Sequence, residues 1–131
     1  MKNKIYRYKT TESKTISALK TEIEKFLKFK EMDSVYTTDH GSYIIIHGSK
    51  DDYWLAKALG SNVAIDIRIT AIEGDSCVDV EISGPSWLSK IISGAGGWFV
   101  PTMLLTAVLG IRDQVVLLDE TERFIKQYFE T

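Results

Sequence analysis

The sequence predicts an α+β fold in which helices cover one face of an antiparallel sheet of about five strands. Apolar and polar residues alternate along two segments within residues 62–83, which is typical of strands with one dry and one wet face. A lysine-rich segment near the start has apolar residues at helical spacing. A long uncharged segment near the end is interrupted by glycine and proline, which favours several short helices over one continuous span.

Length and composition predict a single domain over 1–131, with a core at 1–85 and a helical tail at 86–131. The hydrophobic share of 44% and the charged share of 26% are those of an ordinary globular protein. The single cysteine, Cys77, has no partner for an internal disulfide. No apolar run follows the basic first residues, so no secretory signal is indicated and we expect a cytoplasmic protein.

The first two elements are a strand and a helix. Lys4–Lys9 alternates and carries two tyrosines, which predicts a short strand. Thr10 or Thr11 is a suitable cap for a helix that should end near Phe29. Its predicted buried face consists of Ile16, Leu19, Ile23, Phe26 and Leu27.

Two hairpins are predicted next. Ser34–Thr38 and Tyr43–His47 flank the turn-rich residues 39–42, and Asp51–Leu59 reads as a short helix or a loop. The strands on either side of residues 73–76 form the second hairpin. Its predicted core residues are Val63, Ile65, Ile67, Ile69, Val78, Val80 and Ile82.

The tail is predicted to be a broken set of helices. Ser86 suits the start of a first helix that Gly94 would end, and Pro101 and Gly110 would bracket a second. Asp113 would cap a third. The shared face of that third helix would hold Leu117, Thr121, Phe124, Ile125 and Tyr128.

A membrane span is the alternative for part of this tail. Ile91–Ile111 has 21 residues without a charge, and a spanning helix needs about 20. The punctuation by glycine and proline favours packing on the sheet, while Lys90 and Arg112 at the two ends give no orientation. We therefore predict packed helices rather than a span.

The element order β-α-β-β-β-β-α resembles the TATA-binding-protein-like and helix-grip (START-like) architectures, in which helices lie across a curved antiparallel sheet. The second half is also similar to small uncharacterised bacterial domains. The shared features there are an alternating hairpin, the residues 87–90 (Trp-Leu-Ser-Lys), a Gly/Trp/Pro-containing apolar run and a closing amphipathic helix. Neither resemblance rests on a diagnostic motif or implies an activity.

No catalytic or metal-binding pattern is present. His40 and His47 lack the ligand spacing of a zinc site. Cys77 is not part of any nucleophile–base pattern in the sequence. Gly84–Leu88 lacks the second glycine of a nucleophile elbow, and Gly94–Gly97 lacks the lysine of a phosphate loop. We therefore expect no enzyme activity, no cofactor and no metal.

The charge is uneven along the chain. Residues 1–30 hold nine Lys/Arg and three Glu, a balance of +6, and the remainder has a balance of −8. A basic helix can attract phosphate-rich surfaces, but it can equally be a solvated helix whose lysines pair with acids of the fold. No nucleic-acid motif accompanies the basic segment, so no nucleic acid is expected as a partner.

The tail holds more apolar side chains than one side of a small sheet needs. We therefore expect a non-catalytic binding or assembly domain that uses the tail for self-association, most simply as a dimer, or for binding a hydrophobic small molecule. The candidate contact residues are Trp98, Phe99, Met103, Leu104, Leu105 and Val108. The alternative is a peripheral membrane protein in which residues 91–111 contact lipid and the basic helix faces the headgroups.

Overall fold

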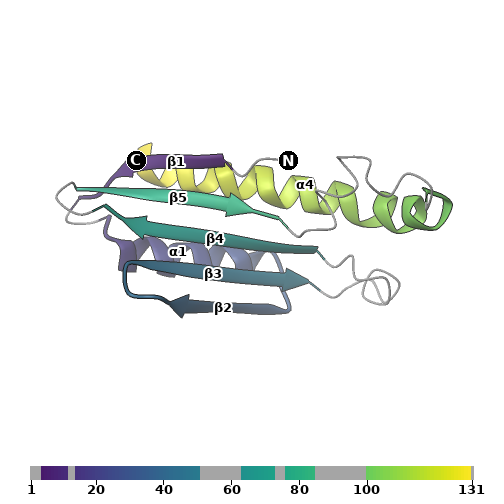
Figure 1. Ribbon diagram of the computed structural model, residues 1–131, viewed down its shortest axis with the longest axis horizontal. Helices are drawn as coiled ribbons and strands as arrows, with labels where there is room; N and C mark the ends of the chain where they lie inside the picture. The colour runs from purple at the N-terminus through teal and green to yellow at the C-terminus, as the bar shows by residue number, and fades with distance from the viewer. Residues whose placement is uncertain (1–3, 12–13, 51–62, 73–75, 85–99, 131) are drawn as a thin grey trace.

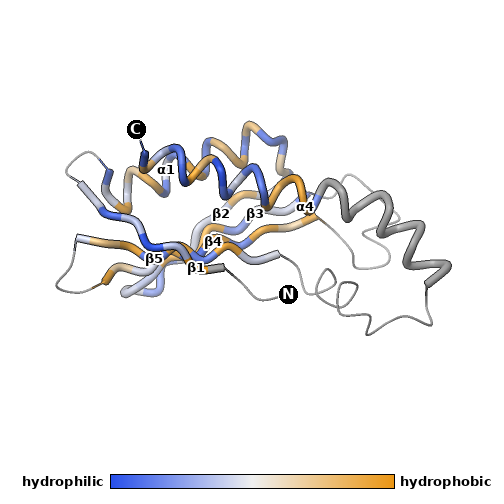
Figure 2. The backbone as a smooth tube through the Cα atoms, turned by 90° about the horizontal axis from the view of Figure 1, so that it is seen from above, coloured by the Kyte–Doolittle hydropathy of each residue, from blue (hydrophilic) through white to orange (hydrophobic). Residues whose placement is uncertain are grey.

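The computed structural model describes residues 4–11, 14–50, 63–72, 76–84 and 100–130. The elements in chain order are β1 (Lys4–Lys9), α1 (Ile16–Phe29), β2 (Ser34–Asp39), β3 (Tyr43–Lys50), β4 (Val63–Ala71), β5 (Cys77–Ser83) and α4 (Val100–Glu130). The strands form one antiparallel sheet in the order β1-β5-β4-β3-β2, and both helices lie on the same face of it (Figures 1 and 2). This confirms the predicted α+β class.

The β4–β5 hairpin supplies most of the dry face of the sheet. Ile67 lies opposite Ile82, and Ile69 lies opposite Val80. Alternation along both strands sends every second side chain toward the helices, which remove it from water. The predicted core residues are buried except Ile82, which is partly buried; the buried ones are Val63, Ile65, Ile67, Ile69, Val78 and Val80.

The helix α1 begins later than the sequence suggested. Its N-cap is Thr15, whose Oγ1 accepts a hydrogen bond of 3.1 Å from the N–H of Ala18. The prediction of a cap at Thr10 or Thr11 was therefore wrong, although the Thr11 hydroxyl accepts a local bond from the N–H of Lys14. Thr15 directly precedes Ile16, which is the first residue of the apolar stripe. The helix therefore begins where its buried face begins, and Thr15 is the threonine that caps it.

The buried face of α1 agrees with the prediction. Leu19, Ile23 and Leu27 are fully buried, and Ile16 and Phe26 are partly buried against the same core. The helix ends at Phe29 as expected, and Glu31 then takes a left-handed conformation with φ of 61° before β2 begins. A left-handed residue just after a helix is a common way of turning the chain.

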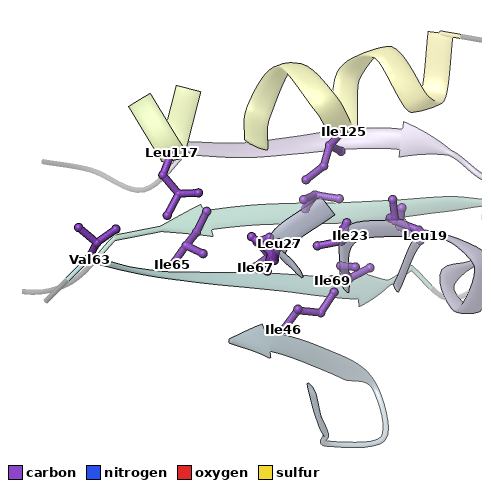
Figure 3. Close-up of a cluster of buried hydrophobic side chains, with 12 residues drawn as sticks. Leu19, Ile23, Leu27, Ile46, Val63, Ile65, Ile67, Ile69, Leu117 and Ile125 are labelled. Carbon is purple, nitrogen blue, oxygen red and sulfur yellow. The ribbon is translucent and has the colours of Figure 1, made fainter. Parts of the chain in front are cut away.

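Gly48 brings the end of α1 close to the sheet. It lies on the dry face of β3, where a Cβ atom would meet Leu27 Cδ1 at 3.2 Å and both Ile65 Cγ2 and Met32 Cε at 3.3 Å. Figure 3 shows Leu27 and Ile65 in the core cluster. The missing side chain therefore allows the last turn of α1 to pack closely on β3.

The C-terminal helix α4 is unbroken from Val100 to Glu130, a length of 31 residues. The predicted helix end at Gly110 and new start at Asp113 were therefore wrong. A glycine inside a helix costs only about 1 kcal/mol, which the burial of a continuing apolar face can outweigh. The predicted helix from Ser86 to Gly94 and the segment Asp51–Leu59 lie outside the described residues.

The second half of α4 packs as predicted. Leu117, Thr121 and Ile125 are buried, and Phe124 and Tyr128 are partly buried. The rings of Phe26 and Phe124 stack with centroids 4.5 Å apart, which joins the two helices. Among the described residues, no helix combines the length and the apolar composition that crossing a membrane requires.

Candidate functional site

The side chain of Gln114 fixes the position of α4 on the sheet. This fully buried residue accepts a hydrogen bond of 2.9 Å at Oε1 from the N–H of Ala64, and its Nε2 donates a bond of 2.7 Å to the carbonyl oxygen of Ala64. At the other end of the helix, the Phe129 ring stacks on Tyr8, which lies opposite Val78. Because Val78 in turn lies opposite Ala71, the helix runs along β4 from its start to its end.

The first half of α4 therefore extends beyond the sheet (Figure 1). Ala64 is the second residue of β4, and the 14 residues 100–113 precede Gln114 in the helix. At about 1.5 Å per residue they add about 21 Å of helix past the start of β4. We call residues 100–113 the overhang.

Four of the predicted contact residues belong to the overhang: Met103, Leu104, Leu105 and Val108. The structure places them on one helix, but their side chains lie outside the described residues, as do Trp98 and Phe99 altogether. The first described side chains after the overhang include two exposed valines. Val115 is 47% exposed and Val116 is 43% exposed, so apolar surface reaches the point where α4 leaves the sheet.

A groove of about 430 Å³ lies between β1 and the last turns of α4. Residues 6–9 of β1 form one side, and Glu122, Lys126, Phe129 and Glu130 form the other. The rings of Tyr8 and Phe129 stack with centroids 4.5 Å apart and nearly parallel planes, so an aromatic pair contributes to its lining. The sequence did not reveal this groove, because it depends on β1 lying at the sheet edge beside α4.

Tyr6 spans the groove by donating a hydrogen bond of 2.5 Å from its hydroxyl to Glu122 Oε1. This bond raises the pKa of Tyr6 from 10.0 to about 12, because the carboxylate stabilises the protonated phenol; burial adds to the effect. The pKa of Tyr8 is also raised, first by burial and then by the negative charges of Glu122 and Glu130. The two tyrosines therefore stay neutral hydrogen-bonding groups at ordinary pH.

A hydrogen-bonded relay crosses the open face of the sheet, the face away from the helices. Asp66 Oδ1 lies 2.6 Å from His47 Nδ1, and His47 Nε2 lies 3.3 Å from Thr38 Oγ1. The same hydroxyl oxygen lies 3.1 Å from His40 Nε2. The register of the sheet brings these residues together, since His47 lies opposite Asp66 and Thr38 lies one strand further along.

Flat side chains hold the two imidazoles in place. The His47 ring stacks on Tyr36 with centroids 4.6 Å apart, and the His40 ring stacks on Tyr43 at 4.7 Å. The guanidinium of Arg68 lies 4.0 Å from the centroid of the Tyr43 ring. These cross-strand contacts stabilise the exposed face, as such pairs do in antiparallel sheets generally.

The relay has the group order carboxylate, imidazole, hydroxyl that hydrolytic triads use. In this protein the hydroxyl of Thr38 also contacts a second imidazole, that of His40. The groove between β1 and α4 is lined by other residues, so the relay does not belong to that groove. Within the part of the chain that the structure describes, no three metal-ligating side chains gather. Sequence reasoning named both histidines but missed Asp66 and Thr38, because only the strand register places them beside His47.

Two of the three lysines of α1, and the lysine just after it, have acidic neighbours. Lys20 lies 3.9 Å from Glu24, and Lys25 lies 3.6 Å from Glu22, both within the helix. Lys30, just after the helix, pairs with Glu120 of α4. The excess positive charge that the first 30 residues show in sequence is therefore partly offset at the surface.

Comparison with known protein families, with curated protein sequences and with solved structures finds no match for this chain.

Proposed function

We propose that this chain is a non-catalytic assembly domain that associates with a second copy of itself through the overhang of α4. The observation that carries the proposal is the length of α4: the helix continues for 14 residues past Gln114, where its packing on the start of β4 is fixed. Residues 100–111 of this extension contain no charged residue. An uncharged helical segment that extends past the sheet supplies apolar residues for contact with a partner.

A second copy is the partner that fits this surface most simply. Two identical overhangs can pair about a two-fold axis, which closes the assembly without leaving a further apolar patch. Met103, Leu104, Leu105 and Val108 supply large apolar residues within the overhang. The exposed Val115 and Val116 extend the apolar surface toward the sheet.

A hydrophobic small molecule or a lipid surface is the alternative partner for the overhang. Lipid binding by a peripheral helix usually combines apolar contact with a basic surface facing anionic headgroups. The basic element expected to face the headgroups is α1, and its Lys20 and Lys25 have glutamates beside them. This pairing leaves less charge for headgroups, which is why self-association is preferred.

Sedimentation of the full chain over a range of concentrations tests the proposal. We expect a dimer in the wild type, and we expect Leu104→Glu and Val116→Lys each to shift the equilibrium toward monomer. Ile5→Lys is the matched control, because Ile5 is 63% exposed and lies on the open face of the sheet, away from the helix layer. It should leave the dimer unchanged.

Two results would count against this function. A monomer at all concentrations, including concentrations well above micromolar, would remove self-association. Binding of the monomer to anionic vesicles, with loss of binding in Leu104→Glu, would instead support the peripheral membrane protein.

A further inference from the structure

We infer that the outer edge of β1 binds an extended peptide of alternating acidic and apolar residues, which adds to the sheet as a sixth strand beside α4. This interaction surface is separate from the overhang and does not depend on the proposed self-association.

The edge position of β1 provides the backbone groups for such binding. β1 is terminal in the strand order and pairs through one edge with β5. Within the described ranges, no strand pairs with its other edge. An edge strand turns the N–H and C=O groups of every second residue outward, and an extended peptide can bond to them.

The groove beside this edge provides room for side chains. Its volume of about 430 Å³ lies within the range of about 300–1,000 Å³ in which ligand sites usually fall. It follows residues 6–9 of β1 on one side, and on the other it follows α4 at Glu122, Lys126, Phe129 and Glu130, which share one helix face. A strand added to β1 would therefore direct alternate side chains into the groove.

The lining of the groove selects apolar side chains at those inward positions. The stacked rings of Tyr8 and Phe129 offer apolar surface. On the α4 side, Glu122 and Glu130 each lie four residues from Lys126, so this side of the lining has one more negative than positive charge. An acidic side chain that points inward would meet this excess negative charge, whereas an apolar side chain would gain contact area against the two rings.

The outward positions of the peptide would face the basic side of β1. Arg7 and Lys9 lie on the open face, and both are exposed. On its inner side β1 pairs with β5, which carries an acidic residue opposite a basic one. Asp79 of β5 lies opposite Arg7 and accepts a hydrogen bond of 2.9 Å from its Nε. The β5 sequence has acidic residues at 79 and 81 and apolar residues at 78, 80 and 82. A peptide of the same pattern therefore fits the outer edge.

A second copy of β1 is a poorer occupant of this edge. Antiparallel pairing of two β1 strands would bring the cations Arg7 and Lys9 of one copy close to those of the other. Like charges on neighbouring strands destabilise the pairing, and basic residues on an edge discourage edge-to-edge association.

The test is a titration of the ¹⁵N-labelled full chain with a synthetic peptide of the sequence of residues 77–83, with serine in place of Cys77 and with blocked ends. We expect saturable shifts of the amide signals of residues 6–9 and 126–130. The control peptide carries lysine in place of Asp79 and Glu81 and should bind much more weakly. Raising the salt concentration should weaken binding of the acidic peptide, because the ion pairs are exposed.

Two protein variants make the test specific. Lys9→Glu should weaken binding of the acidic peptide by about fivefold, because it replaces one exposed ion pair with a contact between like charges. Arg123→Glu changes the net charge equally on an exposed residue of α4 outside the groove lining, and it should leave the affinity unchanged. Amide spectra and thermal midpoints close to those of the wild type will show that both variants are folded.

Four results would overturn the proposal. They are no shift at millimolar peptide, equal binding of the lysine peptide, shifts confined to the β2 edge, and equal loss of affinity in Lys9→Glu and Arg123→Glu. Exchange protection of the outer β1 amides that appears only as the protein concentration rises would assign the edge to a second copy instead.

Discussion

The side-chain amide of Gln114 bonds to both backbone groups of Ala64, as a neighbouring strand would. The pairing of β4 with β5 ends at Asp66, which lies opposite Ser83. Ala64 is two residues earlier in β4, so its backbone N–H and C=O point the same way as those of Asp66. In this register the following partner in sequence would be residue 85, a proline, which has no N–H to donate. Gln114 therefore continues the hydrogen bonding of the sheet from the helix layer.

Gln114→Leu should destabilise the protein by about 2–3 kcal/mol. The leucine would fit the buried site in size but would leave the N–H and C=O of Ala64 without their partners, and each such loss costs about 1–3 kcal/mol when fully buried. Urea denaturation will measure the change. Gln127→Leu, at an exposed position on the same helix, keeps both bonds to Ala64 and should destabilise the protein less than Gln114→Leu does.

Gln114→Glu should give a stability deficit that depends on pH. A protonated carboxyl can both donate and accept at Ala64, whereas a buried carboxylate can only accept, so folding would raise the pKa of the new side chain. The deficit should be smallest below the ordinary glutamate pKa of about 4.3 and should grow as the pH rises. A deficit that stays constant between pH 4 and pH 7 would contradict this role of the amide.

Ile67→Asp should cost more than about 4 kcal/mol, because it places an unpaired charge in the core. Ile67 is fully buried in the central strand β4, opposite Ile46 and Ile82. The matched control is Ile45→Asp on the open face of β3, where the new carboxylate would lie opposite Arg68. Thermal denaturation should show a large loss for the first variant and little change for the second.

Alkaline pH should weaken the fold through Tyr6. Its pKa is raised from 10.0 to about 12 by the hydrogen bond to Glu122, so the folded protein holds this proton more tightly than the unfolded chain. The stabilisation is complete below pH 10 and is lost as the pH rises toward 12. Titration of tyrosine ultraviolet absorbance in the wild type and in Tyr6→Phe will give this pKa from the difference between the two curves. A midpoint near 10 in the difference curve would contradict the hydrogen bond.

The relay on the open face should have one direction of hydrogen bonding. If neutral His47 donates from Nδ1 to Asp66, its Nε2 must accept, and the Thr38 hydroxyl donates to it. The Thr38 oxygen then accepts from Nε2–H of His40. Long-range ¹⁵N–¹H correlation spectra at a pH where both rings are neutral should therefore show opposite tautomers. Thr38→Val should change the His40 tautomer ratio while His47 keeps its proton on Nδ1.

The fold was predictable where one periodicity dominates the sequence. Alternation in β4 and β5 and the apolar stripe of α1 specify both the element and its buried face. Element ends were harder to predict: Thr11 and Thr15 both make local capping bonds, and the tertiary position of Ile16 decides between them. Gly110 and Asp113 carry ordinary stop and start signals, but the packing of α4 outweighs them.

The candidate sites were less predictable because they depend on register. His40 and His47 stand out in the sequence, yet nothing local links them to Asp66, which is 19 residues away from His47. Tyr6 and Glu122 are 116 residues apart in sequence. They meet because β1 pairs with β5, the last of the described strands in the chain, at the edge of the sheet. A single sequence contains no signal for such pairings.

The close packing around Gly48 constrains how this core can change over evolution. Side chains from three separate segments, Leu27, Met32 and Ile65, occupy the space that a side chain at this position would need. An alanine at position 48 therefore requires these side chains to move by a few tenths of an ångström, and a loss of volume at one of the three positions would make room for it. Homologues with a larger residue at 48 should carry a smaller one at 27, 32 or 65, so these four positions should covary.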